Sequence, residues 1–233
     1  MLWYKSWLET RWALVFLFGL YGFVWIVDYA TPKTQPNKLQ NLELPLDVFA
    51  FAWIAASVTF AGTGIKTPSV GFRNTKGLHG STHYTLSLPV SRRRFVRVRA
   101  TVGLLETAFL IVVLSLVGWR MFPDITAQST VKDMLAYLGV AVICSSTFHF
   151  ASMFLATFLD DFLRIPAAMT ILALLIALDT AKVLPPYLNI FRPMGSASPL
   201  MTHEIPWITL AVALAASAVF FLATMKIVQT QEY

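Results

Sequence analysis

Residues 100–122 read ATVGLLETAFLIVVLSLVGWRMF, and this stretch decides the fold class. It contains 23 residues but only two charged side chains, Glu106 and Arg120. A helix of this length rises about 34 Å, which is enough to cross the hydrocarbon core of a bilayer, about 30 Å thick. A β-strand is a poor alternative because apolar and polar residues do not alternate along the stretch. The stretch therefore predicts a transmembrane helix.

Five more apolar runs lie on either side of this one, and together they predict an all-α polytopic membrane protein. We expect a single transmembrane domain over residues 1–233. Its six transmembrane helices are predicted at residues 12–27, 46–65, 100–122, 134–159, 165–181 and 206–228. Residues 2–10 place Trp3 and Trp7 one helical turn apart and predict an N-terminal interfacial helix. The Pro-rich residues 182–204 form either an external loop or a segment that re-enters the membrane.

The composition agrees with a bilayer environment. Hydrophobic residues make up 57% of the chain and charged residues 13%, and the mean hydropathy is +0.65. Soluble domains have about a quarter of their residues charged, so this chain has too little charge for a water-facing surface. The single cysteine, Cys144, lies within an apolar run, which excludes a disulfide framework or a multi-cysteine metal site built within the chain.

The basic residues are distributed unevenly between the predicted loops. If the N-terminus is cytoplasmic and the spans alternate, 12 of the 18 Lys and Arg residues fall on the cytoplasmic side. Most of them lie in residues 66–99, between the second and third spans. The positive-inside rule therefore predicts that both termini and this segment are cytoplasmic. We expect an integral protein of a bacterial plasma membrane.

Residues 66–99 are the longest predicted cytoplasmic segment. Leu86 and Leu88 are apolar anchors for a short helix that would project toward another protein. Pro89 is expected to end that helix, and Ser91 to cap a new helix that continues into the third span. A displacement of this segment would therefore be carried directly into the bundle.

The run TLSLPVSRRRFVRVRA, at residues 85–100, resembles the segment after the second span of type-2 ABC transporter permeases. In that family the segment forms a cytoplasmic coupling helix between spans two and three and contacts an ATPase. The family also has six spans, cytoplasmic termini, an interfacial N-terminal helix and a re-entrant region before the last span. On this resemblance, ATPase coupling is assigned to Gly80, Thr85, Leu86, Leu88, Pro89, Val90, Ser91 and Arg92. The chain departs from the pattern in residues 74–79, which lack the acidic residue often found ahead of the glycine.

The resemblance implies a permease that works as a homodimer with two separately encoded ABC ATPase subunits, which bind ATP and Mg. Export of a hydrophobic or amphipathic substrate is expected. The chain itself is predicted to be no enzyme and to bind no cofactor, because it lacks a P-loop. The nearest approach, GTGIKT at residues 62–67, has Ile65 where the second glycine of that motif is required.

Two polar residues within the predicted spans are candidates for a functional role. Glu106 is expected to pair with a cation at the cytoplasmic membrane edge or with another chain, with substrate contact as the alternative. His149 is expected to pack against a Ser, a Thr or a backbone carbonyl, with a proton or substrate role as the alternative. Small residues of the sixth span predict close helix packing, within the chain or between subunits; they are Ala211, Ala215, Ala216 and Ser217.

Two other function classes are alternatives to transport. A metal-dependent membrane enzyme could use His79, His83 and the pair Asp160–Asp161. However, no third ligand lies near the two histidines, and no second acidic cluster accompanies the aspartate pair on another cytoplasmic loop, so no metal site is expected. A non-transporting membrane scaffold is also compatible with the sequence. The arginine cluster in residues 92–99 is predicted to bind lipid headgroups rather than nucleic acid, because no aromatic stacking platform accompanies it.

Overall fold

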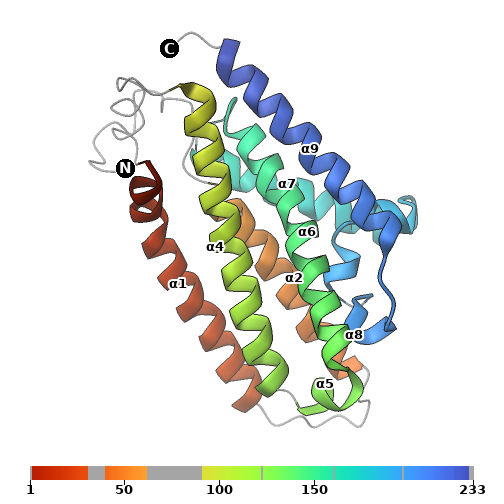
Figure 1. The fold of residues 1–233 in the computed structure, drawn as a ribbon. Coiled ribbons are helices and arrows are strands. Elements are labelled where there is room, and N and C mark those ends of the chain that lie inside the picture. Colours follow the sequence, from red (N-terminus) through yellow and green to blue (C-terminus); the bar gives the residue numbers. More distant parts are fainter. Residues whose placement is uncertain are drawn as a thin grey trace.

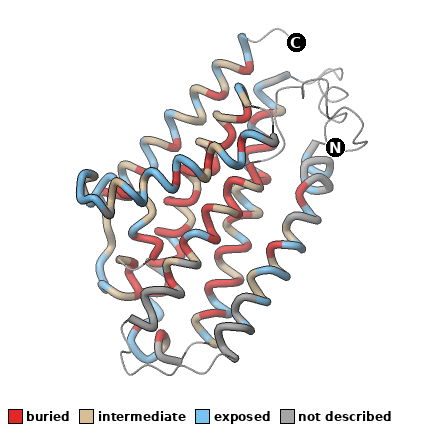
Figure 2. Tube along the Cα trace, turned by 180° about the vertical axis from the view of Figure 1, so that it is seen from behind, coloured by how far each residue is buried: buried red, intermediate tan, exposed pale blue. Residues whose placement is uncertain are grey.

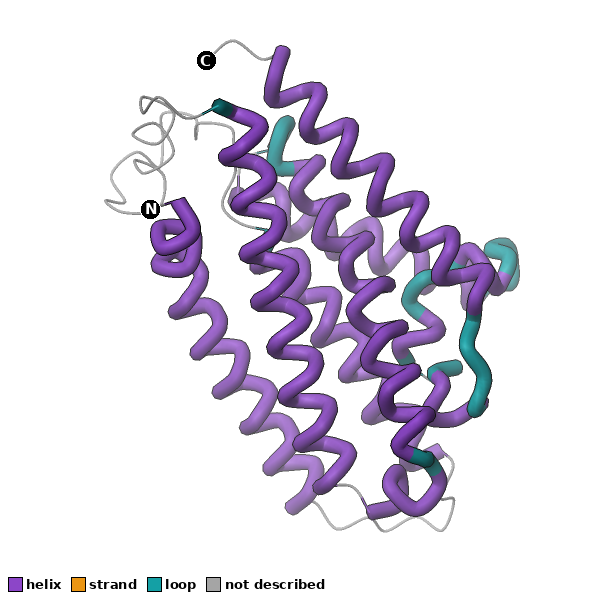
Figure 3. The backbone as a smooth tube through the Cα atoms, in the orientation of Figure 1, coloured by secondary structure: helices purple, strands orange, loops and turns teal. Residues whose placement is uncertain are grey.

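The computed structural model describes residues 2–30, 40–61, 91–121, 123–159, 161–195 and 197–230. All regular elements in these ranges are helical, as the composition predicts (Figure 3). They are the α-helices α1 (Leu2–Ala30), α2 (Gln40–Phe60), α4 (Arg92–Met121), α5 (Pro123–Gln128), α6 (Val131–Leu155), α7 (Asp161–Thr180), α8 (Pro199–Thr202) and α9 (Trp207–Thr230), and the 3₁₀ helices η2 (Pro186–Leu188) and η3 (Arg192–Met194).

The long helices form a bundle with α4 near its centre. Helix α4 lies between α1 and α6, α2 packs behind α4 and α6, and α9 lies along α6 (Figure 1). Helices α1 and α4 begin, and α9 ends, at the same end of the bundle. We call this the upper end, after its place in Figure 1, and the opposite end the lower end.

Three described helices are long and apolar enough to cross a membrane: Arg93–Met121, Val131–Leu155 and Trp207–Thr230. They correspond to the third, fourth and sixth predicted spans. Shorter apolar stretches, Leu14–Phe23 and Phe49–Phe60, lie in α1 and α2. The chain is thus a helical protein with the properties of an integral membrane protein.

The N-terminal region differs from the prediction of an interfacial helix over residues 2–10 followed by a span over 12–27. The structure has one helix, α1, from Leu2 to Ala30. No Gly or Pro precedes Gly19, so nothing in the sequence interrupts the backbone hydrogen bonds at residue 11. The predicted boundary at that residue is therefore wrong.

Helix α7 occupies the position of the predicted fifth span but runs obliquely. Figure 2 shows it lying across the back of the bundle at a large angle to the other long helices. It is not among the three described helices that meet the length and hydropathy criteria for a span. Leu163 and Leu174 are exposed on its outer side.

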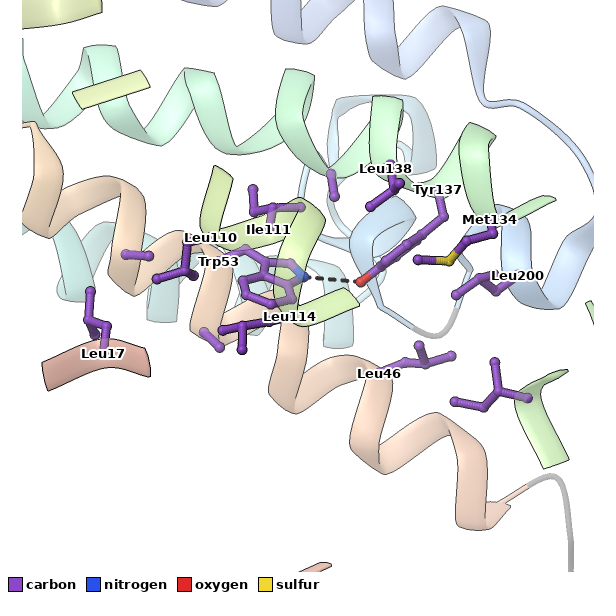
Figure 4. Close-up of a cluster of buried hydrophobic side chains, with 14 of the residues drawn as sticks. Leu17, Leu46, Trp53, Leu110, Ile111, Leu114, Met134, Tyr137, Leu138 and Leu200 are labelled. Carbon is purple, nitrogen blue, oxygen red and sulfur yellow. Dashed lines mark hydrogen bonds between the residues drawn. The ribbon is translucent and has the colours of Figure 1, made fainter. Parts of the chain in front are cut away.

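The core is made where α2, α4 and α6 meet. Trp53 of α2 is buried and donates its indole N–H to the hydroxyl of Tyr137 of α6, at 3.1 Å (Figure 4). Leu110 and Ile111 of α4 pack against this pair and are also fully buried. A buried Tyr–Trp pair that satisfies its polar atoms fixes the register of the two helices.

A second contact, between α6 and α9, is polar. The hydroxyls of Ser146 and Thr147 each lie 3.1 Å from the hydroxyl of Ser217, and Thr147 also donates to the carbonyl of Ala213 at 3.1 Å. Small hydroxyl residues allow helix backbones to approach closely and bond across the interface. Of the two alternatives for the small residues of the sixth span, packing within the chain and packing between subunits, Ser217 therefore supports packing within the chain.

Candidate functional site

Ser91 begins α4 directly after the segment that resembles a coupling helix. Its carbonyl accepts from the backbone N–H of Arg94 at 2.9 Å and of Phe95 at 3.1 Å, and its hydroxyl accepts a longer bond from Arg94 at 3.4 Å. This is the arrangement of an N-cap serine, so the predicted helix start is confirmed. Arg92 is the first residue of α4, which continues unbroken for 30 residues, or about 45 Å, to Met121.

The other residues assigned to ATPase coupling lie outside the described part of the chain; they are Gly80, Thr85, Leu86, Leu88, Pro89 and Val90. The same holds for His79, His83 and Asp160. Among the described residues, no group of three or more His, Cys, Asp or Glu side chains could hold a metal ion.

The first turns of α4 are packed against the ends of three other helices. Val96 and Ala100 are buried in one apolar cluster with Ala61 after α2, Met153 of α6 and Val228 of α9. We call this set the upper cluster. Because its members come from four parts of the chain, the start of α4 cannot move without displacing the helix ends around it.

A hydrogen bond between α4 and α9 lies beside the upper cluster. The Nη2 of Arg93 donates to the side-chain oxygen of Gln229 at 2.8 Å and so joins the start of α4 to the end of α9.

The arginines of α4 have two different environments. Arg93, Arg94 and Arg97 are exposed, as headgroup binding requires. Arg99 is only 6% exposed, and its guanidinium lies 5.8 Å from the centre of the Phe95 ring, in a cation–π contact. The prediction that the whole cluster faces lipid headgroups is therefore wrong for Arg99.

His149 of α6 is completely buried where α2, α4 and α6 meet. Its Nδ1 lies 3.2 Å from the carbonyl oxygen of Ser57 in α2. This confirms the expectation that the imidazole packs against a backbone carbonyl within the bundle. The other ring nitrogen, Nε2, is buried and has no hydrogen-bond partner among the described residues.

Gly103 of α4 makes this arrangement possible. A Cβ at this position would lie 2.2 Å from the carbonyl oxygen of Phe60 and 2.6 Å from Cε1 of His149. Only a residue without a side chain permits such an approach of α4 to its two neighbours. Sequence analysis did not single out Gly103; the one signal was a glycine inside a long apolar helix, where it is otherwise unfavourable.

Glu106 lies one turn further along α4 and is half-buried against α1. Its Oε1 accepts a hydrogen bond from the hydroxyl of Thr10, while its Oε2 is buried with no hydrogen-bond partner among the described residues. The described partner is thus a neutral hydroxyl, whereas a cation was expected. Thr10 was also not singled out from the sequence, because one threonine among the polar and aromatic residues of the N-terminal segment forms no pattern.

The candidate residues that the structure describes lie around the first half of α4. Ser91 caps α4, and Gly103 and Glu106 lie on it. His149 of α6 and the members of the upper cluster from the other helices pack beside it. Comparison of the chain with known proteins finds no matching family model, no similar curated protein and no similar solved structure.

Proposed function

We propose that the chain is the membrane-spanning subunit of an ATP-driven ABC transporter and exports a hydrophobic or amphipathic substrate. Two copies would work with two separately encoded ATPase subunits, which supply ATP binding and hydrolysis. The chain would have six spans in a bacterial plasma membrane, with its termini and residues 66–99 in the cytoplasm.

One observation carries this proposal. The motif at residues 85–92 ends with Ser91 and Arg92, where α4 begins, and the first turns of α4 are packed into the upper cluster. A rigid helix that begins at the edge of a contact segment transmits a displacement rather than absorbing it in a loop. ATP-driven movement of a partner at this segment would shift α4 relative to α2, α6 and α9.

The partner can be tested by site-directed cross-linking, because Cys144 is the one cysteine in the sequence and its replacement leaves a chain without cysteine. We expect Leu88→Cys, in a Cys144→Ala chain in native membranes, to cross-link to a protein that is labelled by azido-ATP. The matched control is Lys132→Cys, an exposed position at the lower end of the bundle, which should give no such product. An equal yield from both positions would contradict the proposal.

The coupling role is tested by the activity of the purified complex in proteoliposomes. We expect the double variant Leu86→Asp, Leu88→Asp to lose substrate-stimulated ATP hydrolysis, because two charges would replace the apolar contact. The control is Val131→Asp, which introduces the same charge at an exposed residue at the start of α6. Complex assembly and coupled hydrolysis that survive in the double variant would exclude this segment as the coupling element.

A further inference from the structure

A cavity of about 510 Å³ lies between the start of α9 and the segment that precedes it. This volume is within the range of small-molecule binding sites, about 300–1,000 Å³. Its walls are mainly apolar and aromatic, with one cationic side chain. The argument below uses Tyr187, Arg192, Trp207 and Ile208, which all line it.

The cation, Arg192, is carried on a rigid turn. The side-chain oxygen of Asn189, which is buried, accepts hydrogen bonds from the backbone N–H groups of Phe191 at 3.0 Å and Arg192 at 3.3 Å. The carbonyl of Arg192 in turn accepts from Gly195 at 3.1 Å and Ala197 at 3.3 Å. A cation held on a fixed backbone loses less freedom when it binds an anion.

The same turn is anchored to the bundle. Gly195 is buried, and a Cβ there would lie 2.0 Å from Oδ1 of Asp47 in α2. Pro193 and Met194, which lie between Arg192 and Gly195 in the sequence, are buried as well. The wall that carries Arg192 is therefore part of the folded core, so the cavity is preformed.

Arg192 carries the one charge among the residues that line the cavity. Its side chain is exposed at the cavity, and none of the described acidic side chains forms an ion pair with it. The site thus offers one guanidinium, with its planar fork of donors, to a phosphate or carboxylate. The neutral walls add no further charge.

The wall that α9 contributes is mainly apolar and includes exposed side chains. Trp207 is 71% exposed and Ile208 67% exposed, and they form the first turn of a helix with the length and composition of a membrane span. Tryptophan and tyrosine concentrate at the level of lipid headgroups. Tyr187 and Trp207 therefore indicate that the cavity lies where a headgroup meets its acyl chains.

We propose that this cavity binds a lipid with an anionic headgroup, with the phosphate on Arg192 and an acyl chain along Trp207 and Ile208 of α9. The site is distinct from the residues assigned to ATPase coupling. It goes beyond the proposed function, because lipid binding here requires neither ATP nor a partner subunit.

The test is native mass spectrometry of the purified full chain in detergent, titrated with phosphatidylglycerol. We expect Arg192→Gln to weaken binding about fivefold, the effect of one cation near a headgroup. Binding of phosphatidylcholine, whose choline offsets the charge of its phosphate, should weaken less. The matched control is Arg120→Gln, which removes another exposed cation, at the end of α4, and should leave affinity unchanged. Thermal unfolding in the same detergent shows that each variant is folded.

A second variant tests the apolar wall. Trp207→Ala should weaken binding of phosphatidylglycerol, whereas Phe109→Ala, an exposed aromatic residue in the middle of α4, should not. Equal losses in the two arginine variants would show a general charge effect and overturn the proposal. Competition by inorganic phosphate at the concentrations at which the lipid binds would also overturn it, because the site would then recognise a free anion and not a lipid.

Discussion

Gly103 is the residue at which α4 comes closest to its neighbours. We expect Gly103→Ala to lower the free energy of unfolding by about 1–3 kcal/mol, because the new methyl group would overlap the Phe60 carbonyl and the His149 ring. The measurement is unfolding of the purified chain by SDS, followed by circular dichroism.

Gly139 provides the control for this substitution. A Cβ there meets no atom within 4 Å, so Gly139→Ala should be neutral or stabilise helix α6 by about 0.5–1 kcal/mol. Equal effects of the two substitutions would show that the close approach at Gly103 does not contribute to the free energy of unfolding.

The hydrogen bond between Thr10 and Glu106 can also be tested by single substitutions. Thr10→Val should cost about 1 kcal/mol in the native chain and almost nothing in a Glu106→Leu background, because the acceptor is then absent. Glu106→Gln keeps an acceptor oxygen and should retain the effect of Thr10→Val. A double-mutant cycle with no coupling energy would mean that the two side chains do not bond in the membrane.

At the scale of elements, the contact between α6 and α9 depends on shared hydroxyls. Thr147→Val and Ser217→Ala should each destabilise the protein by about 0.6 kcal/mol, and the double variant by less than the sum, because the two residues share one bond. Thr101→Val removes a hydroxyl that bonds only within α4 and serves as the control. Full additivity in the double variant would argue against the shared bond.

The start of α6 is stabilised by a capping box. The hydroxyl of Thr130 accepts from the backbone of Asp133, whose carboxylate accepts from the backbone of Thr130 and lies 3.0 Å from Nδ1 of His203. Asp133→Ala should therefore cost about 1–2 kcal/mol in the free energy of unfolding. Lys132→Ala, at an exposed neighbour, should cost almost nothing, and a comparable loss there would contradict the capping role.

The sequence predicted those elements whose signal is local. The long apolar runs located α4, α6 and α9, and a serine after a proline located the start of α4. The oblique path of α7 could not be predicted, because the apolar run over residues 165–178 predicts a helix but gives no information on its angle to the other helices. The burial of Arg99 and the contact of Gly103 with Phe60 and His149 depend on which helices become neighbours, and apolar composition does not determine that.

At the scale of the whole molecule, the orientation in the membrane can be measured. In a Cys144→Ala chain, we expect Arg94→Cys to react with a membrane-impermeant maleimide only after the cells are permeabilised, because the positive-inside rule assigns the upper end to the cytoplasm. Lys132→Cys, at the lower end, should react in intact cells. The reverse pattern would invert the topology and remove the ATPase from reach of residues 66–99.

The unbroken length of α4 has one more consequence, since Gly103 does not lie at its middle. At about 1.5 Å per residue, Gly103 is about 16 Å from Arg92 and about 27 Å from Met121. If the tight contact at Gly103 acts as a fulcrum, α4 is a lever with a short arm toward the upper end and a long arm toward the lower end. A displacement of about 2 Å at Arg92 would then move Met121 by about 3 Å in the opposite direction, so a small movement at the upper end would be amplified at the lower end.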